Sequence, residues 1–226
     1  MQLKQCRAPC CRFSENALWD IVGKVCKQPL HKLWGSFRSE MPLYLTTVWP
    51  VQTPLNQSDL HLAPLVWKSF NTETSAPEQV DHYQDEVTPA QQAADLLELK
   101  KRGGYNYFKF RIQRSDWRKD VEAVRLCKEA LGPESKIMLD RTGDDAGDWS
   151  HETALEVAHA LKEVGAEWLE EPFKRDYDIS GASEETVKRH ARLTAEAPLP
   201  ITGGEHQPIA VYHDYLAGKS FNIIQV

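Results

Sequence analysis

From residue 88 to the C-terminus, helix-like and strand-like segments alternate along the chain. The first predicted helix begins at the capping pair Thr88-Pro89 and ends at Gly103-Gly104. Its alanines and leucines include the one-face spacing of an amphipathic helix. The later predicted helices are residues 117–131, 150–164, 183–195 and 208–218, and the strands are residues 107–112, 137–139, 167–169, 199–202 and 221–226. This order predicts an α/β fold in which helices cover a parallel sheet or barrel.

Periodicity alone leaves two architectures open for this region. Short right-handed crossovers suit either a doubly wound sheet or a TIM-type barrel. The choice between them depends on the residues at the strand ends, which are considered below.

The first part of the chain is less regular. Residues 14–28 predict a helix with one apolar face, and residues 42–49 predict a strand. A long segment rich in Pro, Ser, Thr, Asn and Gln follows, at about residues 50–88. Segments of that length are usually functional or disordered, so we expect either a lid or a disordered insertion. The chain is therefore divided into residues 1–40 and residues 41–226.

Composition excludes several classes of partner. The net charge is −6 and the basic residues are scattered, so we expect neither nucleic acid nor a membrane surface as a partner. No apolar run approaches the roughly 20 residues that a membrane helix needs. Five cysteines without regular spacing favour a reducing, cytoplasmic location. Cys6, Cys10 and Cys11 could suggest a soft-metal site, but no paired Cys and His follow at zinc-finger spacing, which favours free thiols.

Three acidic residues stand at the ends of consecutive predicted strands: Asp140, Glu170 and Glu205. In a parallel barrel those ends meet at one rim, where catalytic groups gather. Carboxylates about 4 Å apart repel by about 4 kcal/mol per pair at an effective dielectric of about 20. They must therefore bind protons or share a cation, and Mg²⁺ suits such ligands. The alternative is that each acid only ends a strand or caps a helix.

Two cations precede these acids on the strand of residues 107–112. Lys109 and Arg111 are two positions apart, so they lie on one face of the strand. If that face lines the barrel, both cations point toward the predicted metal site. In the alternative, Phe108, Phe110 and Ile112 fill the interior and the cations face solvent.

Several motifs together resemble one protein family. The residues that carry the resemblance are Ala17–Lys24, Gln28-Pro29-Leu30, Leu33-Trp34-Gly35, Lys109-Phe110-Arg111, Asp140, Leu169-Glu170-Glu171-Pro172 and Gly203-Gly204-Glu205. Together they resemble the mandelate racemase/muconate lactonizing branch of the enolase superfamily, from about residue 14 to the end. Residues 1–40 then resemble a remnant of that branch's capping domain, and residues 41–226 an incomplete (β/α) barrel.

The resemblance implies a Mg²⁺ enzyme that removes the proton next to a substrate carboxylate and stabilises the resulting enediolate. By position, Asp140, Glu170 and Glu205 would be the metal ligands. Lys109 and Arg111 would be catalytic, with Lys109 contacting the substrate carboxylate or the developing negative charge. His206 adjoins a ligand and would reach the substrate, whereas His213 would be structural or solvated.

This sequence departs from the family pattern at two places. Arg111 replaces the second Lys of the usual pair, and Arg is a poor general base because it stays protonated. This favours a one-sided reaction, such as dehydration of a sugar acid by a hydro-lyase, over racemisation by two bases. Arg141-Thr142 replaces the small polar dipeptide that usually follows the first ligand.

Length is the larger departure. The chain ends in the sixth predicted barrel strand, so the family's later acid/base residues and the first strands of the capping domain are missing. We therefore expect a truncated form, and the alternative to a sugar-acid enzyme is an inactive homologue that retains only metal binding. An open barrel also exposes strand edges and apolar surface, which agrees with truncation. Whether the chain is a monomer or a homo-oligomer is left open.

Overall fold

The computed structural model describes residues 8–38, 40–47, 87–112, 114–141 and 147–225, with side chains from residue 15 onward. The chain divides into two compact units, Met1–Leu43 and Tyr44–Val226. The insertion expected at about residues 50–88 lies almost wholly outside the described residues, as do Cys6 and the side chains of Cys10 and Cys11. No helix in the described ranges is both long enough and apolar enough to cross a membrane.

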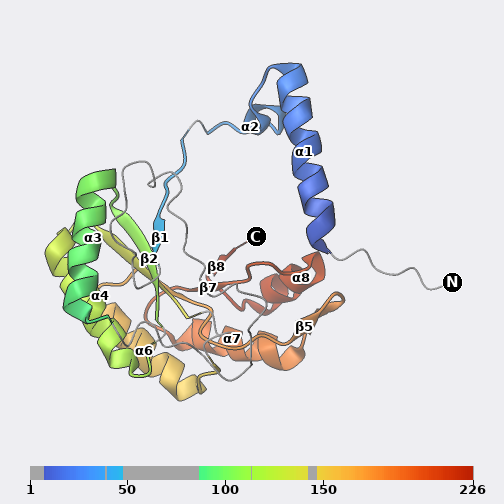
Figure 1. Ribbon diagram of the computed structural model, residues 1–226. Helices are drawn as coiled ribbons and strands as arrows, with labels where there is room; N and C mark the ends of the chain where they lie inside the picture. Colours follow the sequence, from blue (N-terminus) through green and yellow to red (C-terminus); the bar gives the residue numbers. More distant parts are fainter. Residues whose placement is uncertain (1–7, 39, 48–86, 113, 142–146, 226) are drawn as a thin grey trace, which may run out of the picture. The chain divides into compact units, whose positions relative to one another are not determined.

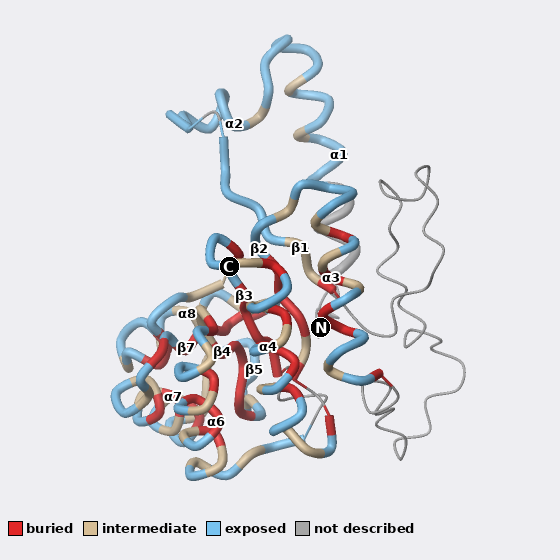
Figure 2. Tube along the Cα trace, turned by 90° about the vertical axis from the view of Figure 1, so that its left-hand side faces the viewer, coloured by how far each residue is buried: buried red, intermediate tan, exposed pale blue. Residues whose placement is uncertain are grey.

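The first unit contains two helices, α1 (Ala8–Cys26) and α2 (Leu30–Leu33). Helix α1 begins earlier than the sequence predicts, and α2 was not expected. The rings of Trp19 and Trp34 meet edge to face, with their centroids 5.1 Å apart, and so join the two helices. In this unit the apolar side chains of α1 are largely exposed (Figure 2).

The second unit is built on a parallel sheet whose strands follow one another in chain order (Figure 1). Its order is β1-β2-β3-β4-β7-β8, and every neighbouring pair is parallel. The strands are β1 (Leu45–Thr47), β2 (Tyr107–Arg111), β3 (Lys136–Asp140), β4 (Leu169–Glu170), β7 (Ile201–Gly203) and β8 (Ile223–Ile224). A doubly wound sheet reverses its strand order, whereas a barrel does not. The predicted partial (β/α) barrel is therefore confirmed.

Helices connect these strands and lie outside the curved sheet (Figure 1). The described ones are α3 (Pro89–Gly103), α4 (Trp117–Leu131), α6 (His151–Glu163), α7 (Glu184–Glu196) and α8 (Ile209–Gly218). The side chains of Thr88, Asp116, Ser150 and Ser183 each accept a backbone hydrogen bond at the start of a helix. Gly104 ends α3 at φ 69°, a left-handed conformation that glycine adopts readily.

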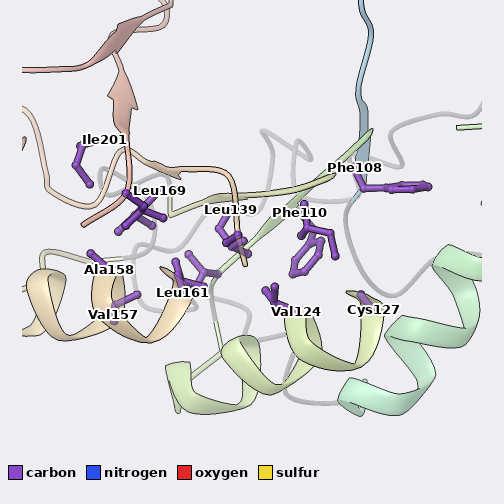
Figure 3. Packing of buried hydrophobic residues seen from close by; sticks show 14 of the residues in the cluster. Phe108, Phe110, Val124, Cys127, Leu139, Val157, Ala158, Leu161, Leu169 and Ile201 are labelled. Atoms are coloured by element: carbon purple, nitrogen blue, oxygen red, sulfur yellow. The ribbon is translucent and has the colours of Figure 1, made fainter. Parts of the chain in front are cut away.

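The hydrophobic core lies between the sheet and these helices. Phe108, Phe110 and Leu139 are fully buried, and Phe110 and Leu139 point toward the helices that carry Val124 and Leu161 (Figure 3). Because side chains alternate along a strand, the residues between these apolar positions face the other side of the sheet. Lys109 and Arg111 are therefore on the inner face, and the alternative in which the phenylalanines fill the barrel interior is wrong.

A short hairpin follows β4 and was not predicted. Its strands, β5 (Tyr177–Asp178) and β6 (Gly181–Ala182), pair antiparallel. Ser180 donates its backbone N–H to Asp178 Oδ1 at 2.7 Å, which stabilises the turn. Asp214 of α8 accepts the backbone N–H of Ala182 at 2.8 Å and so fixes the hairpin to the barrel. Strands this short carry no periodic signal in the sequence.

His190 of α7 makes stability sensitive to acid. Its ring is fully buried against the rings of Phe173, Tyr215 and Phe221, and its Nδ1 lies 2.8 Å from the carbonyl oxygen of Thr186. Burial is the main reason that the pKa of His190 is lowered from 6.5 to about 4.

We therefore expect stability to fall as the pH drops from 6.5 to 4. Over that range the unfolded chain binds the proton and the folded chain does not, so the stabilisation is complete above pH 6.5 and is lost toward pH 4. Relative to a His190→Gln variant, the wild type should lose about 3 kcal/mol of unfolding free energy between pH 7 and pH 4. Urea unfolding at each pH measures this. As a control, the variant at the exposed His213, His213→Gln, should show the same change of unfolding free energy with pH as the wild type. If all three proteins show the same change, the expectation is wrong.

Candidate functional site

Two of the predicted metal ligands are the last residues of neighbouring strands, and their side chains lie on the inner face of the sheet. Asp140 is the last residue of β3 and Glu170 is the last residue of β4. The register pairs Arg111 with Asp140, Asp140 with Glu170, and Glu170 with Thr202. Residues paired in this way lie side by side on the same face of a sheet. The strands thus bring a cation, two carboxylates and a hydroxyl into one row at the carboxyl end of the barrel.

Lys109 joins the two carboxylates. Its Nζ lies 3.1 Å from Asp140 Oδ2 and 2.8 Å from Glu170 Oε1, and all three side chains are more than nine-tenths buried. Arg111 forms a second ion pair with Asp140 and is about one-fifth exposed. Sequence analysis placed Lys109 and Arg111 beside the acids, and the structure brings Asp140, Glu170 and both cations together.

The electrostatics of this group follow from its burial. Burial, and then the charge of Asp140, raise the pKa of Glu170 to about 7, although Lys109 acts in the opposite direction. Burial alone would lower the pKa of Lys109, but Asp140 and Glu170 outweigh it and raise that pKa. The Lys109 ammonium is therefore held in its charged form, and the negative charge of the two acids exceeds what Lys109 alone can balance.

Tyr44 contacts the Lys109 ammonium, and Trp168 and Gln225 contact Glu170; sequence analysis missed all three. Lys109 Nζ lies 5.5 Å from the centre of the Tyr44 ring, and the Tyr44 and Trp168 rings meet edge to face at 5.9 Å. Trp168 donates its Nε1–H to Glu170 Oε2 at 3.4 Å, and the side chain of Gln225 also hydrogen-bonds to Glu170. Trp168 could have been found from its spacing, because it stands two residues before Glu170 on the same strand face.

The third predicted ligand lies beyond a strand end. Glu205 follows Gly203-Gly204 in a turn after β7, and its side chain is partly exposed. Within the described part of the chain, no three His, Cys, Asp or Glu side chains are placed so that they could hold a metal ion. The set of Asp140, Glu170 and Glu205 therefore stays a prediction. His206, in the same turn, is exposed and has a φ of 59°, and His213 is exposed on α8.

Glu171 is a fourth carboxylate at this rim that sequence analysis did not assign. It is almost fully buried, and burial is the main cause that raises its pKa to about 8. The charges of Asp140, Glu205 and Glu170 raise it further, whereas Arg175 lowers it. The dipeptide Glu170-Glu171 was the available signal, but the sequence does not tell which acid faces the interior.

Arg141 occupies the position after the first predicted ligand. Its guanidinium donates to the carbonyl oxygens of Ile112 at 3.1 Å and Gly147 at 3.3 Å, and it lies 4.4 Å from the centre of the Trp149 ring. Arg141 is thus held by backbone groups that follow β2 and β3. The next residue, Thr142, lies outside the described residues.

The chemistry of this rim fits a hard divalent cation. An ammonium already stands between Asp140 and Glu170, so a positive charge is favourable at that place. Among the described residues, two buried oxygens here, Thr202 Oγ1 and Glu171 Oε2, have no hydrogen-bond partner. Carboxylate and hydroxyl oxygens are ligands that Mg²⁺ prefers. Asp140 and Glu170 would hold such an ion, together with Glu205 if its side chain turns toward them.

Comparisons with known proteins agree with the fold. A family model described as "Enolase C-terminal domain-like" matches residues 90–226. The chain is 25% identical over 192 residues to arabinonate dehydratase of Saccharolobus solfataricus, and 26% identical over 193 residues to 3,6-anhydro-alpha-L-galactonate cycloisomerase of Streptomyces coelicolor. Each match covers 84% of this chain and 39% of the relative, so the chain spans well under half the length of these relatives.

Solved structures show the same arrangement. A racemase from Streptomyces coelicolor with bound magnesium superposes with a TM-score of 0.63 and 22% identity, over 92% of this chain and 48% of that protein. D-glucarate dehydratase from Agrobacterium tumefaciens, complexed with magnesium, gives a TM-score of 0.62 and 22% identity, over 92% and 45%. At this level of identity the likeness shows the fold alone.

Proposed function

Because the chain belongs to the enolase C-terminal domain-like family, we propose that it carries the Mg²⁺ site of an enolase-superfamily enzyme that acts on a sugar acid. The observation that carries this proposal is the Lys109 ammonium, which holds Asp140 and Glu170 together at the ends of adjacent parallel strands. The names of the relatives support the substrate class, since arabinonate dehydratase and D-glucarate dehydratase act on acids derived from sugars.

In the proposed reaction a base other than Lys109 and Arg111 takes the proton next to the substrate carboxylate, and in a dehydration the neighbouring hydroxyl group then takes up a proton and leaves as water. When bound, Mg²⁺ supplies positive charge that stabilises the enediolate oxygens. Asp140, Glu170 and Glu205 are proposed to hold the ion, and His206 to contact the substrate from the turn after β7.

Lys109 and Arg111 are proposed to stabilise negative charge and not to act as bases. Lys109 is kept protonated by the two carboxylates beside it, and an arginine side chain does not lose its proton in proteins. Both cations lie on the inner face of β2 beside Asp140, which supports a role in stabilising the enediolate charge. The absence of a second titrating lysine at position 111 supports dehydration, a reaction that needs no pair of opposed bases.

Mg²⁺ should stabilise the folded chain. At about 100 times its Kd, an ion that binds only the folded state raises the free energy of unfolding by about 2.7 kcal/mol. Thermal melting with and without MgCl₂ measures this shift, and Glu170→Gln should abolish it.

A matched control for this substitution is Glu167→Gln. Glu167 precedes β4, at the end of the strand away from Glu170, and it pairs with the exposed Lys136. The rise in melting temperature that Mg²⁺ causes in Glu167→Gln should equal the rise in the wild type. If the wild type melts at the same temperature in millimolar Mg²⁺ as without it, or if Glu170→Gln shifts as the wild type does, the proposed site is wrong.

A second experiment separates the enzyme from a protein that only binds metal. The wild type is incubated in D₂O with Mg²⁺ and a panel of sugar acids, and α-deuterium exchange and loss of water are followed by NMR. Exchange that Lys109→Met abolishes supports the enzyme. Mg²⁺ binding without exchange on any of the acids would assign this chain metal binding alone.

A further inference from the structure

Glu171 and Arg175 contact the turn that carries Glu205. The Glu171 side chain is about 1% exposed and that of Arg175 about 7%, and the two form an ion pair. Glu171 Oε1 also accepts the backbone N–H of Gly204 at 3.3 Å. Arg175 Nη1 donates to the backbone carbonyl oxygen of Glu205 at 3.2 Å. One buried ion pair therefore holds backbone groups of two successive residues of the turn.

The turn itself leaves little freedom around this pair. Gly204 has a φ of 103°, a conformation that other residues rarely adopt. A Cβ added at Gly203 would lie 2.9 Å from the Phe221 ring and 3.1 Å from Glu171 Cγ. Gln207 also donates its Nε2–H to the Glu205 carbonyl oxygen, at 2.9 Å. Glu171 thus binds the backbone N–H that precedes Glu205, and Arg175 and Gln207 both donate to the carbonyl oxygen of Glu205.

Glu171 adopts a conformation that places its side chain at this turn. Its φ is 46°, in the left-handed region that is unfavourable for a residue with a Cβ. Its backbone N–H nevertheless continues the pairing between strands, because it donates to the carbonyl oxygen of Thr202 at 2.9 Å. The side chain of Glu171 contacts the turn after β7, whereas Glu170 stays with Lys109 on the inner face.

We propose that Glu171 and Arg175 are positioning residues that fix the Gly203–Glu205 turn so that the Glu205 side chain can reach the metal held by Asp140 and Glu170. This inference rests on the proposed Mg²⁺ site. Neither residue is proposed to touch the ion. Groups that orient metal ligands from outside usually change metal affinity by about 10–100-fold when they are substituted.

The test compares Mg²⁺ binding by the full chain and by two variants, using isothermal titration calorimetry. Glu171→Gln keeps the shape and an acceptor oxygen but removes the carboxyl group that pairs with Arg175. Arg175→Met removes the donor to the Glu205 carbonyl oxygen. Each variant should raise the Kd for Mg²⁺ about 10–100-fold. Using two variants keeps the test decisive if one of them fails to fold.

Arg189→Met is the matched control. Arg189 likewise joins a carboxylate and a backbone carbonyl, since it binds Asp148 Oδ2 at 2.7 Å and the oxygen of Trp149, but it contacts no predicted ligand. Its loss should leave the Mg²⁺ affinity unchanged, even if it lowers stability. A purely structural role for Glu171 and Arg175 would make all three variants alike.

Hydrogen exchange separates failure of this inference from failure of the proposed function. In Mg²⁺-free protein, the Gly204 amide, which donates to Glu171, should exchange at least about tenfold faster in Arg175→Met than in the wild type, because its turn loses a fixed contact. If the wild type binds Mg²⁺ and both variants bind it equally well, the positioning role is wrong and the proposed function stands. If the wild type does not bind Mg²⁺, the proposed function is wrong, and unchanged exchange in the turn would overturn the positioning role as well.

Discussion

Replacing Lys109 with Met should lower the free energy of unfolding by about 3–5 kcal/mol in the absence of Mg²⁺. The substitution removes the ammonium that lies 2.8 Å from Glu170 and 3.1 Å from Asp140, and it leaves two buried carboxylates facing each other. Urea unfolding followed by circular dichroism at pH 8 measures the change. Removing one partner of a buried ion pair costs this much because the remaining charge cannot regain its water.

The double variant Lys109→Met/Glu170→Gln tests this explanation. It removes one of the two repelling charges and keeps an amide of the same shape beside Trp168, so it should be more stable than Lys109→Met alone. Lys136→Met is the control, because Lys136 on the same sheet pairs with Glu167 at an exposed position and should cost less than about 1 kcal/mol. A Lys109→Met variant no less stable than this control would contradict the buried charge cluster.

Replacing Arg114 with Met should have a similarly large effect, a loss of about 3–5 kcal/mol in the free energy of unfolding. Arg114 is buried three residues after the end of β2, and it pairs with the fully buried Asp120 of α4. It also donates to the carbonyl oxygen of Val87 at 2.8 Å and to Gln92 Oε1 of α3 at 2.9 Å. One guanidinium thus joins α3 and α4 to the segment after β2. Its loss removes a buried donor from Val87, Gln92 and Asp120, and Asp120 keeps only the backbone N–H of residue 114 from this segment.

Arg118→Met is the matched comparison for Arg114. Arg118 lies four residues further along, where it pairs with Asp116 and Glu156 at a largely exposed position. Its loss should change stability by less than about 1 kcal/mol. Equilibrium unfolding of both variants under the same conditions provides the measurement, and equal losses would show that burial does not decide the contribution of these arginines.

The helices and long strands of the barrel could be predicted from local sequence. Thr88 and Ser150 cap their helices where the sequence placed the caps, and Gly104 ends α3 as expected. These features depend on residues close together in the chain, and so they are visible without the fold. The hairpin of β5 and β6 was missed because two-residue strands have no period, and α2 was missed because its single turn carries no amphipathic pattern.

The site could be predicted only in part. Asp140 and Glu170 are recognisable as strand-end acids, and the spacing of Lys109 and Arg111 places them on one face. Tyr44 and Gln225 were not found, because they come from the first and last parts of the barrel and meet Lys109 and Glu170 only after the strands pair. The role of Glu171 was hidden too, because its contacts with Gly204 and Arg175 form only in the folded chain, after β4 and β7 pair.

The sequence by itself determined the order of the elements, the apolar face of each helix and the acids at the strand ends, because these features are set by spacing along the chain. Periodicity left the doubly wound sheet and the barrel open, the family resemblance implied the barrel, and the strand order confirmed it. Tertiary structure alone decided that Phe108 and Phe110 face the helices and that Lys109 lies between Asp140 and Glu170. The physical reason is that burial of Phe108 and Phe110 in the core beside the helices places Lys109 and Arg111 on the opposite face of β2. Lys109 is buried there and needs charged partners, which come from β3 and β4, far away in the sequence.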